Sequence, residues 1–506
     1  MDKEFHSLEE QRTTIGVAKP SIPSSSNILG WTRRVVHLLG RRILLKPTTP
    51  KKEHLKTTSW LDGLRGFAAL LVYFHHHQLW VHMPGNKSRW FENSYGYEGE
   101  YYFAAMHGIR IFFSGGHFAV ATFFVISGYV LSTRPMGLIH SGDHERLAQS
   151  LSSGLFRRWI RLFLPTLATT LLWLTSWHAF GWWCKPFEPQ PTYLAELAKW
   201  YQEVKQYIFL YRGPEGFPWL YWNLHTWTIP FEFKGSLGIY TVLLALSMST
   251  RNIRLLLTIG LAFYFLYMVD GWYLAMFLSG MLLCDLDLLA AEEELPMFLS
   301  AADPYKKHVF IGLFIISVIL GSVPLAQNDH EDFKKSPGWR YLSFLKPDAI
   351  NDHKWFFLFW AATFLVSAVP RVPWLKSFFN TRFCQYLGRV SYSLYLVHGP
   401  MIWSLGNVLY LLVGWSKDEA DYPLPNYFGK FPITKAGPMG LEPAFWLPQL
   451  VLLPATLWIS NFVTVLIDEP SIQSAVWARN KTLRPDSKGP PNEATPIQSL
   501  SDHTPK

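Results

Sequence analysis

The feature that most constrains this chain is a series of long apolar stretches that recurs from residue 61 almost to the C-terminal end. A helix needs roughly 20 apolar residues to cross a hydrocarbon core of about 30 Å. Because that core offers no water to backbone groups, apolar stretches of this length cross it as helices. The stretches lie at 61–81, 109–131, 159–180, 228–248, 253–269, 271–289, 308–326, 355–370, 386–411 and 447–467. The sequence therefore predicts an all-α, polytopic membrane protein with about ten transmembrane helices.

The composition supports this prediction, because charge is too sparse to cover a large soluble surface. Charged residues make up 16% of the chain and hydrophobic residues 49%, whereas soluble proteins carry roughly 25% charged residues. The three cysteines, Cys184, Cys284 and Cys384, form no CxxC pair and cannot build a dense disulfide framework. These figures exclude a disordered chain and a small disulfide scaffold.

The formal net charge of +9 is explained by orientation in the membrane. With ten spans and a cytosolic N-terminus, the cytosolic segments carry most of the 46 Lys and Arg residues. This is the bias expected from the positive-inside rule. Both termini are therefore predicted to be cytosolic, and no nucleic-acid partner is needed to explain the charge.

The predicted spans divide the chain into three regions. Residues 1–57 form a polar, basic N-terminal segment. Within it, 28–45 has the pattern of an amphipathic helix that could lie among lipid headgroups, although a plain basic tail is the equal alternative. Residues 58–472 form the predicted transmembrane domain, and residues 473–506 a disordered cytosolic tail. The tail is too short to hold a soluble catalytic domain, so we expect the chemistry within the membrane or its loops.

Ionisable residues inside apolar spans are costly, which makes them functional candidates. In the first span, Asp62 and Arg65 lie one helical turn apart and can pair. His76 follows Arg65 by almost three turns, so it shares their face and lies about 16 Å deeper. His75 and His77 point about 100° to either side of it. Burial favours the neutral imidazole, which suits His76 to general-base catalysis.

Two other interpretations of these histidines stay open at this point. In the first, His76 is a structural residue that is hydrogen-bonded to a neighbouring helix. In the second, a metal or haem is held by His75–His77 together with His107 and His117 near the second span. Consecutive side chains on one helix diverge, so that set makes a poor chelate, and we expect no bound metal.

A second cluster, Arg157, Arg158 and Arg161, lies at the predicted cytosolic start of the third span. Arg158 and Arg161 are three residues apart on a helix, so their guanidinium groups can converge on one anion. Phosphate is a natural ligand, since arginine binds it through two parallel hydrogen bonds. An ordinary basic flank is the alternative, but Arg161 lies inside the apolar run.

These residues belong to a series of motifs that resembles the acyltransferase-3 family of integral-membrane acyltransferases. The resemblance covers roughly residues 58–472, and no single motif carries it. The motifs are Leu61-Asp-Gly-Leu-Arg-Gly66 with His76, Phe123-Phe-Val-Ile-Ser-Gly-Tyr129, Arg158-x-x-Arg161 before Pro165, Trp227-Thr-Ile-Pro-Phe-Glu232, and Ser391-Tyr-Ser-Leu-Tyr395-Leu-Val-His398-Gly-Pro400.

The resemblance implies an activity as well as a fold. Family members take an acyl group, most often acetyl, from acyl-CoA on the cytosolic face and pass it to a hydroxyl of a sugar or natural product. It implies that His76 is the general base and that Asp62 and Arg65 order the helix entrance or the donor. Coenzyme A phosphates would be held by Arg158 and Arg161, with Arg157 beside them.

The remaining motif residues have less definite roles. Glu232 could orient a histidine or the acceptor, or could pair with Lys234 or an arginine. Tyr395 and His398 are interpreted as structural rather than catalytic.

The partners expected from the resemblance are the lipid bilayer, acyl-CoA as co-substrate, and a hydroxylated small molecule or glycan, with no permanently bound cofactor. The predicted location is an endomembrane or the plasma membrane. The main alternative function is a multi-pass transporter of a small hydrophobic or sugar-like solute. Carriers often contain inverted repeats, and we find no convincing repeat in the sequence.

Overall fold

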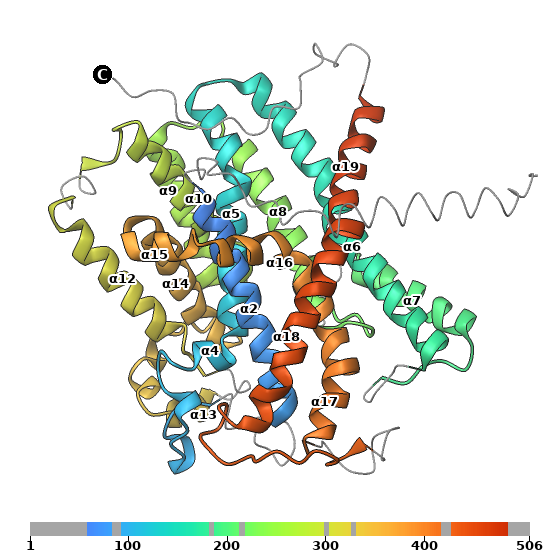
Figure 1. The fold of residues 1–506 in the computed structure, drawn as a ribbon. Helices are drawn as coiled ribbons and strands as arrows, with labels where there is room; N and C mark the ends of the chain where they lie inside the picture. Colours follow the sequence, from blue (N-terminus) through green and yellow to red (C-terminus); the bar gives the residue numbers. More distant parts are fainter. Residues whose placement is uncertain are drawn as a thin grey trace, which may run out of the picture. The chain divides into compact units, whose positions relative to one another are not determined.

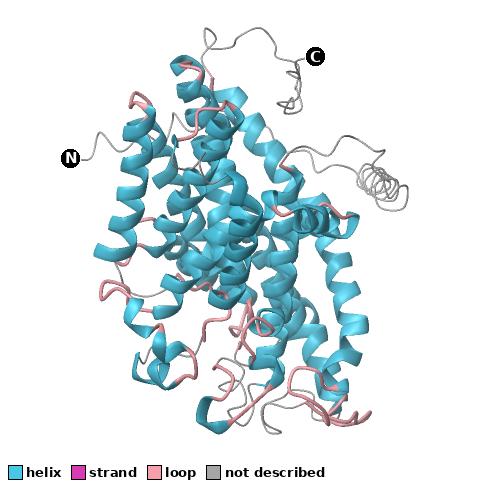
Figure 2. Cartoon of the chain, turned by 90° about the vertical axis from the view of Figure 1, so that its left-hand side faces the viewer, coloured by secondary structure: helices cyan, strands magenta, loops and turns pink. Residues whose placement is uncertain are grey.

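The computed structural model describes residues 58–82, 93–181, 187–211, 218–297, 303–324, 330–415 and 427–483. All of them belong to one compact unit, Lys56–Lys506. Within these ranges every regular element is a helix (Figure 2), so the predicted all-α fold is confirmed. The predicted N-terminal segment 1–57, with its possible amphipathic helix 28–45, lies outside the described residues.

Each of the apolar stretches coincides with a helix, apart from differences at the ends. These helices are α2 (Ser59–His82), α5 (Gly116–His140), α6 (His144–Phe180), α8 (Thr228–Ala245), α9 (Arg251–Phe263), α10 (Trp272–Ala291), α12 (Lys306–Leu320), α14 (His353–Ala368), α16 (Arg382–Met401) and α18 (Pro443–Val463) (Figure 1). The fold thus follows the apolar pattern of the sequence closely.

Shorter helices connect or extend these. They are α4 (Ile111–Ser114), α7 (Tyr193–Tyr207), α13 (His330–Lys335), α15 (Pro373–Phe379), α17 (Asn407–Leu412) and α19 (Glu469–Thr482). Single 3₁₀ turns are η3 (Tyr97–Gly99), η4 (Phe103–Ala105), η5 (Leu224–Trp227), η7 (Asp303–Tyr305), η8 (Trp339–Tyr341), η9 (Ser343–Leu345) and η10 (Val369–Arg371). Three π-helical segments, η6 (Tyr264–Met268), η11 (Ile402–Gly406) and η14 (Thr464–Asp468), follow α9, α16 and α18.

Among the described residues, three helices are long and apolar enough to cross a membrane by length and composition. They are Gly116–His140, Trp272–Ala291 and the continuous helix Pro443–Thr482. A fourth is counted if the bent pair α14–α15 is one span. Several of the other helices are shorter than 18 residues. The number of ten spans and the cytosolic position of both termini therefore stay predictions.

Helix α2 lies within the core, where it packs against both α5 and α16, and α5 also packs against α10. The crossing of α2 and α16 is unusually close. A Cβ added to Gly66 would lie 2.2 Å from the backbone nitrogen of Gly388, a distance that no side chain can occupy. The glycine of the Leu61–Gly66 motif is therefore required because two helix backbones meet there.

The C-terminal end departs from the sequence prediction. Helix α19 continues to Thr482, so 473–482 are helical where the sequence predicted the start of a disordered tail. The reason is tertiary: α19 packs against α6, and Arg479 donates a hydrogen bond to Ser152 Oγ at 3.0 Å. The polar sequence alone does not reveal that contact. The rest of the tail, 484–506, lies outside the described residues.

Candidate functional site

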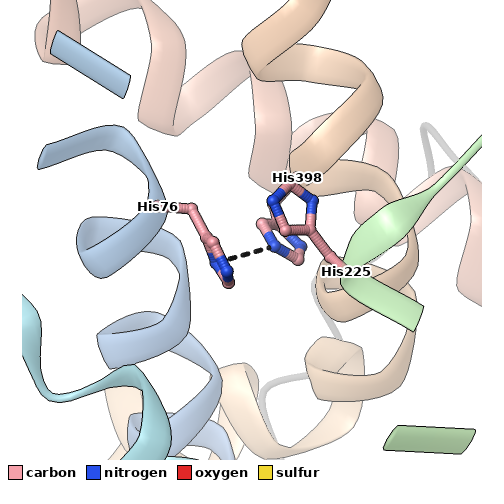
Figure 3. A group of neighbouring side chains, drawn as sticks. All are labelled: His76, His225 and His398. Carbon is pink, nitrogen blue, oxygen red and sulfur yellow. Dashed lines mark hydrogen bonds between the residues drawn. The ribbon is translucent and has the colours of Figure 1, made fainter. Parts of the chain in front are cut away.

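Three histidines from three separate elements converge in the core of the helical unit (Figure 3). His76 comes from α2, His225 from η5 and His398 from α16. One ring nitrogen of each lies within 4.8 Å of those of the other two. The ring centroids of His76 and His225 are 4.0 Å apart, and that of His398 lies 5.0 Å and 4.7 Å from them. We refer to these three residues as the histidine cluster.

Hydrogen bonds fix which nitrogen of each ring carries the proton. His76 Nδ1 lies 2.9 Å from the carbonyl oxygen of Val72, and His398 Nδ1 lies 3.2 Å from that of Leu394. A carbonyl can only accept, so both Nδ1 atoms are protonated in the neutral rings. The single Nδ1–H of His76 is then shared between Val72 O and the unprotonated Nε2 of His398, 3.2 Å away. His76 Nε2 keeps a free lone pair and can accept a proton.

The position of His225 is set by residues of two of the sequence motifs. The hydroxyl of Tyr395 donates to the carbonyl oxygen of His225 and lies 2.6 Å from Thr228 Oγ1. The ring of His225 stacks on Trp403, with centroids 5.0 Å apart. A side chain at Gly399 would come within 2.4 Å of His225 Nδ1, so glycine leaves the space that this ring fills. Tyr395 thus contacts the short helix η5 that carries His225.

The neighbouring histidines of α2 face elsewhere. His77 Nδ1 lies 2.7 Å from the hydroxyl of Tyr410, and the ring of His75 packs edge-on against His117, 5.5 Å away. His107 stacks on Trp339. The predicted alternative metal set is therefore not brought together among the described residues. Of the three successive histidines, His76 is the one that the fold directs toward His225 and His398.

Arg65 fastens the start of α2 to α16. Its guanidinium pairs with Asp62 at 3.0 Å and donates to Ser391 Oγ and to the Gly388 carbonyl oxygen, each at 3.1 Å. The predicted pairing of Asp62 and Arg65 is therefore present. These bonds lie at the close helix crossing, about 16 Å along α2 from His76. Through them Arg65 links the first motif of the chain to the last.

Glu232 pairs with an arginine, Arg158, which is one of the roles considered for it from the sequence. It accepts hydrogen bonds from Arg158 Nη2 and, at 2.5 Å, from Ser127 Oγ. Arg158 also donates to Ser236 Oγ at 2.8 Å, whereas Lys234 lies over the ring of Phe231 instead. Ser127, Arg158 and Glu232 belong to three different motifs, which meet here in one network. The charge of Arg158 is thereby balanced by a carboxylate.

The other two arginines of this region are placed differently from Arg158. Arg161 is exposed, and it lies within electrostatic reach of Arg158, Arg65 and Asp468. Arg157 donates from Nε to the carbonyl oxygen of Ser153 within α6. Arg161 therefore lies near both Arg158 and Arg65, and the convergence of Arg158 and Arg161 on one anion stays a prediction. We refer to Arg65, Arg158 and Arg161 as the arginine cluster.

His225 is not among the residues predicted from the sequence, because it precedes the apolar span that begins at residue 228. The available signal was its position two residues before Trp227 in a motif. His398, interpreted from the sequence as structural, has its ring hydrogen-bonded to that of His76.

Comparison with known proteins agrees with this arrangement of motifs. The family model of the acyltransferase domain Acyl_transf_3 matches residues 58–465. The chain therefore belongs to the acyltransferase-3 family. It is a membrane protein and an enzyme that transfers acyl groups, which sets the transporter alternative aside.

Two relatives that are named as acyltransferases are similar in sequence to the chain. The chain is 30% identical over 481 residues to the O-acetyltransferase PaAT-1 of Phomopsis amygdali, covering 87% of this chain and 88% of that protein. It is 23% identical over 343 residues to the acyltransferase clz18 of Cochliobolus lunatus, covering 59% of this chain and 70% of that protein. No solved structure matches the chain.

Proposed function

We propose that this protein is a multi-pass membrane O-acyltransferase that moves an acyl group, acetyl in the first instance, from acyl-CoA to a hydroxyl of a small natural product or glycan. The single observation that carries the proposal is the set of contacts made by the His76 ring. Its Nδ1 is engaged by Val72 and His398, at 2.9 Å and 3.2 Å, which leaves Nε2 as a proton acceptor. The name of the relative in Phomopsis amygdali, an O-acetyltransferase, supports the choice of oxygen and of acetyl.

In the proposed reaction, His76 Nε2 takes the proton of the acceptor hydroxyl while the hydroxyl oxygen attacks the thioester carbonyl carbon. A carbon–oxygen bond forms, the carbon–sulfur bond breaks, and coenzyme A leaves as a thiolate. The protonated His76 then returns the proton to that sulfur. The base is regenerated, and neither a redox partner nor a permanently bound cofactor is required.

The other two histidines would assist without exchanging protons themselves. The lone pair on His398 Nε2 accepts from His76 Nδ1–H, and this bond strengthens as His76 becomes positively charged. His225 Nδ1 is buried and has no hydrogen-bond partner among the described residues. It offers a polar group to the substrate beside the ring of His76, 4.0 Å away between centroids.

The donor would be bound by the arginine cluster, with its phosphates on the cytosolic side. Arg161 is the principal candidate, because the residue is exposed. Arg158 is balanced by Glu232 and would contribute less. Arg157 would add to the local positive field. Bound there, an extended acyl-CoA could reach about 16 Å along α2 to His76.

Several expectations about the setting belong to the same proposal. The chain would cross an endomembrane or the plasma membrane about ten times, with both ends in the cytosol. The acceptor would be a hydroxylated small molecule or glycan, with the lipid bilayer as the other partner and no nucleic acid.

The test is transfer of radiolabel from acetyl-CoA to organic-soluble acceptors. The assay uses membranes that contain the protein, and the acceptors come from a metabolite extract of the cells in which the protein naturally occurs. We expect labelled product with the wild type and with the control His107→Ala, and none above background with His76→Ala. Full transfer by His76→Ala at equal protein level would rule out the base assignment. Absence of transfer with several acyl-CoA donors would count against the function itself.

A further inference from the structure

The histidine cluster has the composition of a metal site as well as of a catalytic one. We infer that it binds one divalent transition-metal ion, with Zn²⁺ as the best match, and that this ion inhibits acyl transfer by occupying His76. The inhibition, unlike the binding, rests on the proposed function.

The spacing of the donor atoms fits three ligands of a tetrahedral ion. Zinc–nitrogen bonds are about 2.0–2.1 Å long, so the nitrogens of two ligands lie about 3.3 Å apart. His76 Nδ1 and His398 Nε2 are already 3.2 Å apart, and all three donors lie within 4.8 Å of one another. Small ring rotations, closing gaps of at most about 1.5 Å, complete the triangle.

The ligand type and its surroundings point to the same class of ion. Three imidazoles with an open fourth position are the ligand set of many zinc sites, and imidazole suits zinc, copper and nickel rather than magnesium or calcium. Metal-bound histidines usually donate their second nitrogen to a carbonyl or carboxylate. His398 Nδ1 already contacts Leu394 O in this way, which leaves its Nε2 for the ion. His76 would bind through Nδ1 and exchange its bond to Val72 O for the bond to the metal.

The histidine cluster differs from the metal set of His75–His77, His107 and His117 that was considered from the sequence. Consecutive residues His75 to His77 diverge around one helix, whereas the cluster takes one ligand from each of three elements (Figure 3). His225 supplies a second indication. Its Nδ1 is buried without a hydrogen-bond partner among the described residues, and buried nitrogens of this kind normally have one.

Occupation by the ion would remove the base. A neutral imidazole has one lone pair, so a metal-bound His76 has none left for the proton of an acceptor hydroxyl. The ion and the acceptor therefore compete for the same ring. Added Zn²⁺ should lower the rate of acyl transfer, and a chelator should restore it.

Binding is tested on the full chain, purified in detergent through a tag without histidines. Equilibrium dialysis against Zn²⁺ alone should give one ion per chain, and Co²⁺ should produce the visible absorption of a tetrahedral site. His225→Gln should weaken binding by roughly tenfold or more, since even changes around a metal ligand cost that much. His107→Ala is the matched control and should bind as the wild type does.

Zn²⁺ binding by the wild-type chain tests the inference even if the variants fail to fold. A wild-type chain that binds no Zn²⁺ at micromolar free metal would overturn it, as would unchanged binding by a folded His225→Gln variant. If Zn²⁺ binds but acyl transfer continues, the base assignment fails and the metal site stands. If His76→Ala abolishes transfer while the wild type binds no Zn²⁺, the metal site is refuted and the base assignment stands.

Discussion

The two polar clusters that α2 connects differ in the partners that their side chains have. In the arginine cluster, each of the two internally bonded guanidinium groups has a carboxylate beside it, Arg158 with Glu232 and Arg65 with Asp62. In the histidine cluster, the rings face one another and the hydrogen bonds run to backbone carbonyls. A largely buried charge such as that of Arg158 requires its partner for stability, whereas a neutral ring can be exchanged with less structural cost. We therefore expect substitutions in the histidine cluster to lower activity, and substitution within the Arg158–Glu232 pair to lower stability.

The largest effect is expected for His76→Ala. Removal of a general base typically lowers the rate by about 10²–10⁴-fold, while the ring's modest hydrogen bonds make a small contribution to stability. The measurement pairs initial rates with the thermal unfolding midpoint in detergent. A variant that loses its folded state together with its activity would break the proposed separation.

Glu232→Gln should have the opposite signature. Without the carboxylate, Arg158, with only 12% of its side chain exposed, keeps an unbalanced charge, and breaking such a pair costs about 3 kcal/mol. We expect a clearly lower unfolding midpoint.

The matched control is Glu469→Gln, because Glu469 also pairs with an arginine, Arg389, but both side chains are about half exposed. Exposed pairs contribute at most about 1 kcal/mol, so its midpoint should hardly move. Equal losses for the two substitutions would contradict the assignment of Arg158–Glu232 as an interior pair.

Arg161→Gln should raise the KM for acyl-CoA by roughly 10–100-fold with little change in unfolding. The reason is the loss of a charged hydrogen bond to phosphate, about 1.5–3 kcal/mol, made by a residue that is exposed in the structure. Steady-state kinetics with acyl-CoA as the varied substrate gives the measurement. An unchanged KM, with kcat lowered instead, would place the donor elsewhere.

The smallest effect is expected for His398→Asn, which sharpens the comparison within the histidine cluster. It removes the bond to His76 Nδ1, 3.2 Å long, and a neutral hydrogen bond contributes about 1 kcal/mol. We expect kcat to fall roughly fivefold and KM for acyl-CoA to stay constant. A fall as large as that of His76→Ala would mean that His398 itself exchanges a proton.

The sequence predicted the helices well, because apolar stretches of this length have few other solutions in a membrane. It also predicted the pairing of Asp62 with Arg65 and the different directions of His75, His76 and His77, since both depend on the geometry of a single helix. It could not predict which helices face one another. The contact of His398 with His76, and the presence of His225 beside both, are created by tertiary packing across more than a hundred residues.

Arg158 illustrates the same limit. Its spacing from Arg161 predicts two converging cations, but the sequence does not reveal that Glu232, 74 residues away, takes one of them. Helical periodicity specifies direction around an axis and depth along it. It does not specify the neighbour that a side chain meets.

The close approach of Gly66 and Gly388 affects the position of the proposed base, which lies far from either residue. His76 lies about ten residues beyond Gly66 on the same rigid helix, or about 15 Å. A tilt of α2 by about 5° at the crossing would displace the imidazole by about 1.3 Å over that length. Such a shift is enough to break a hydrogen bond of 3.2 Å to His398. The alignment of the proposed base thus depends on two residues that have no side chains.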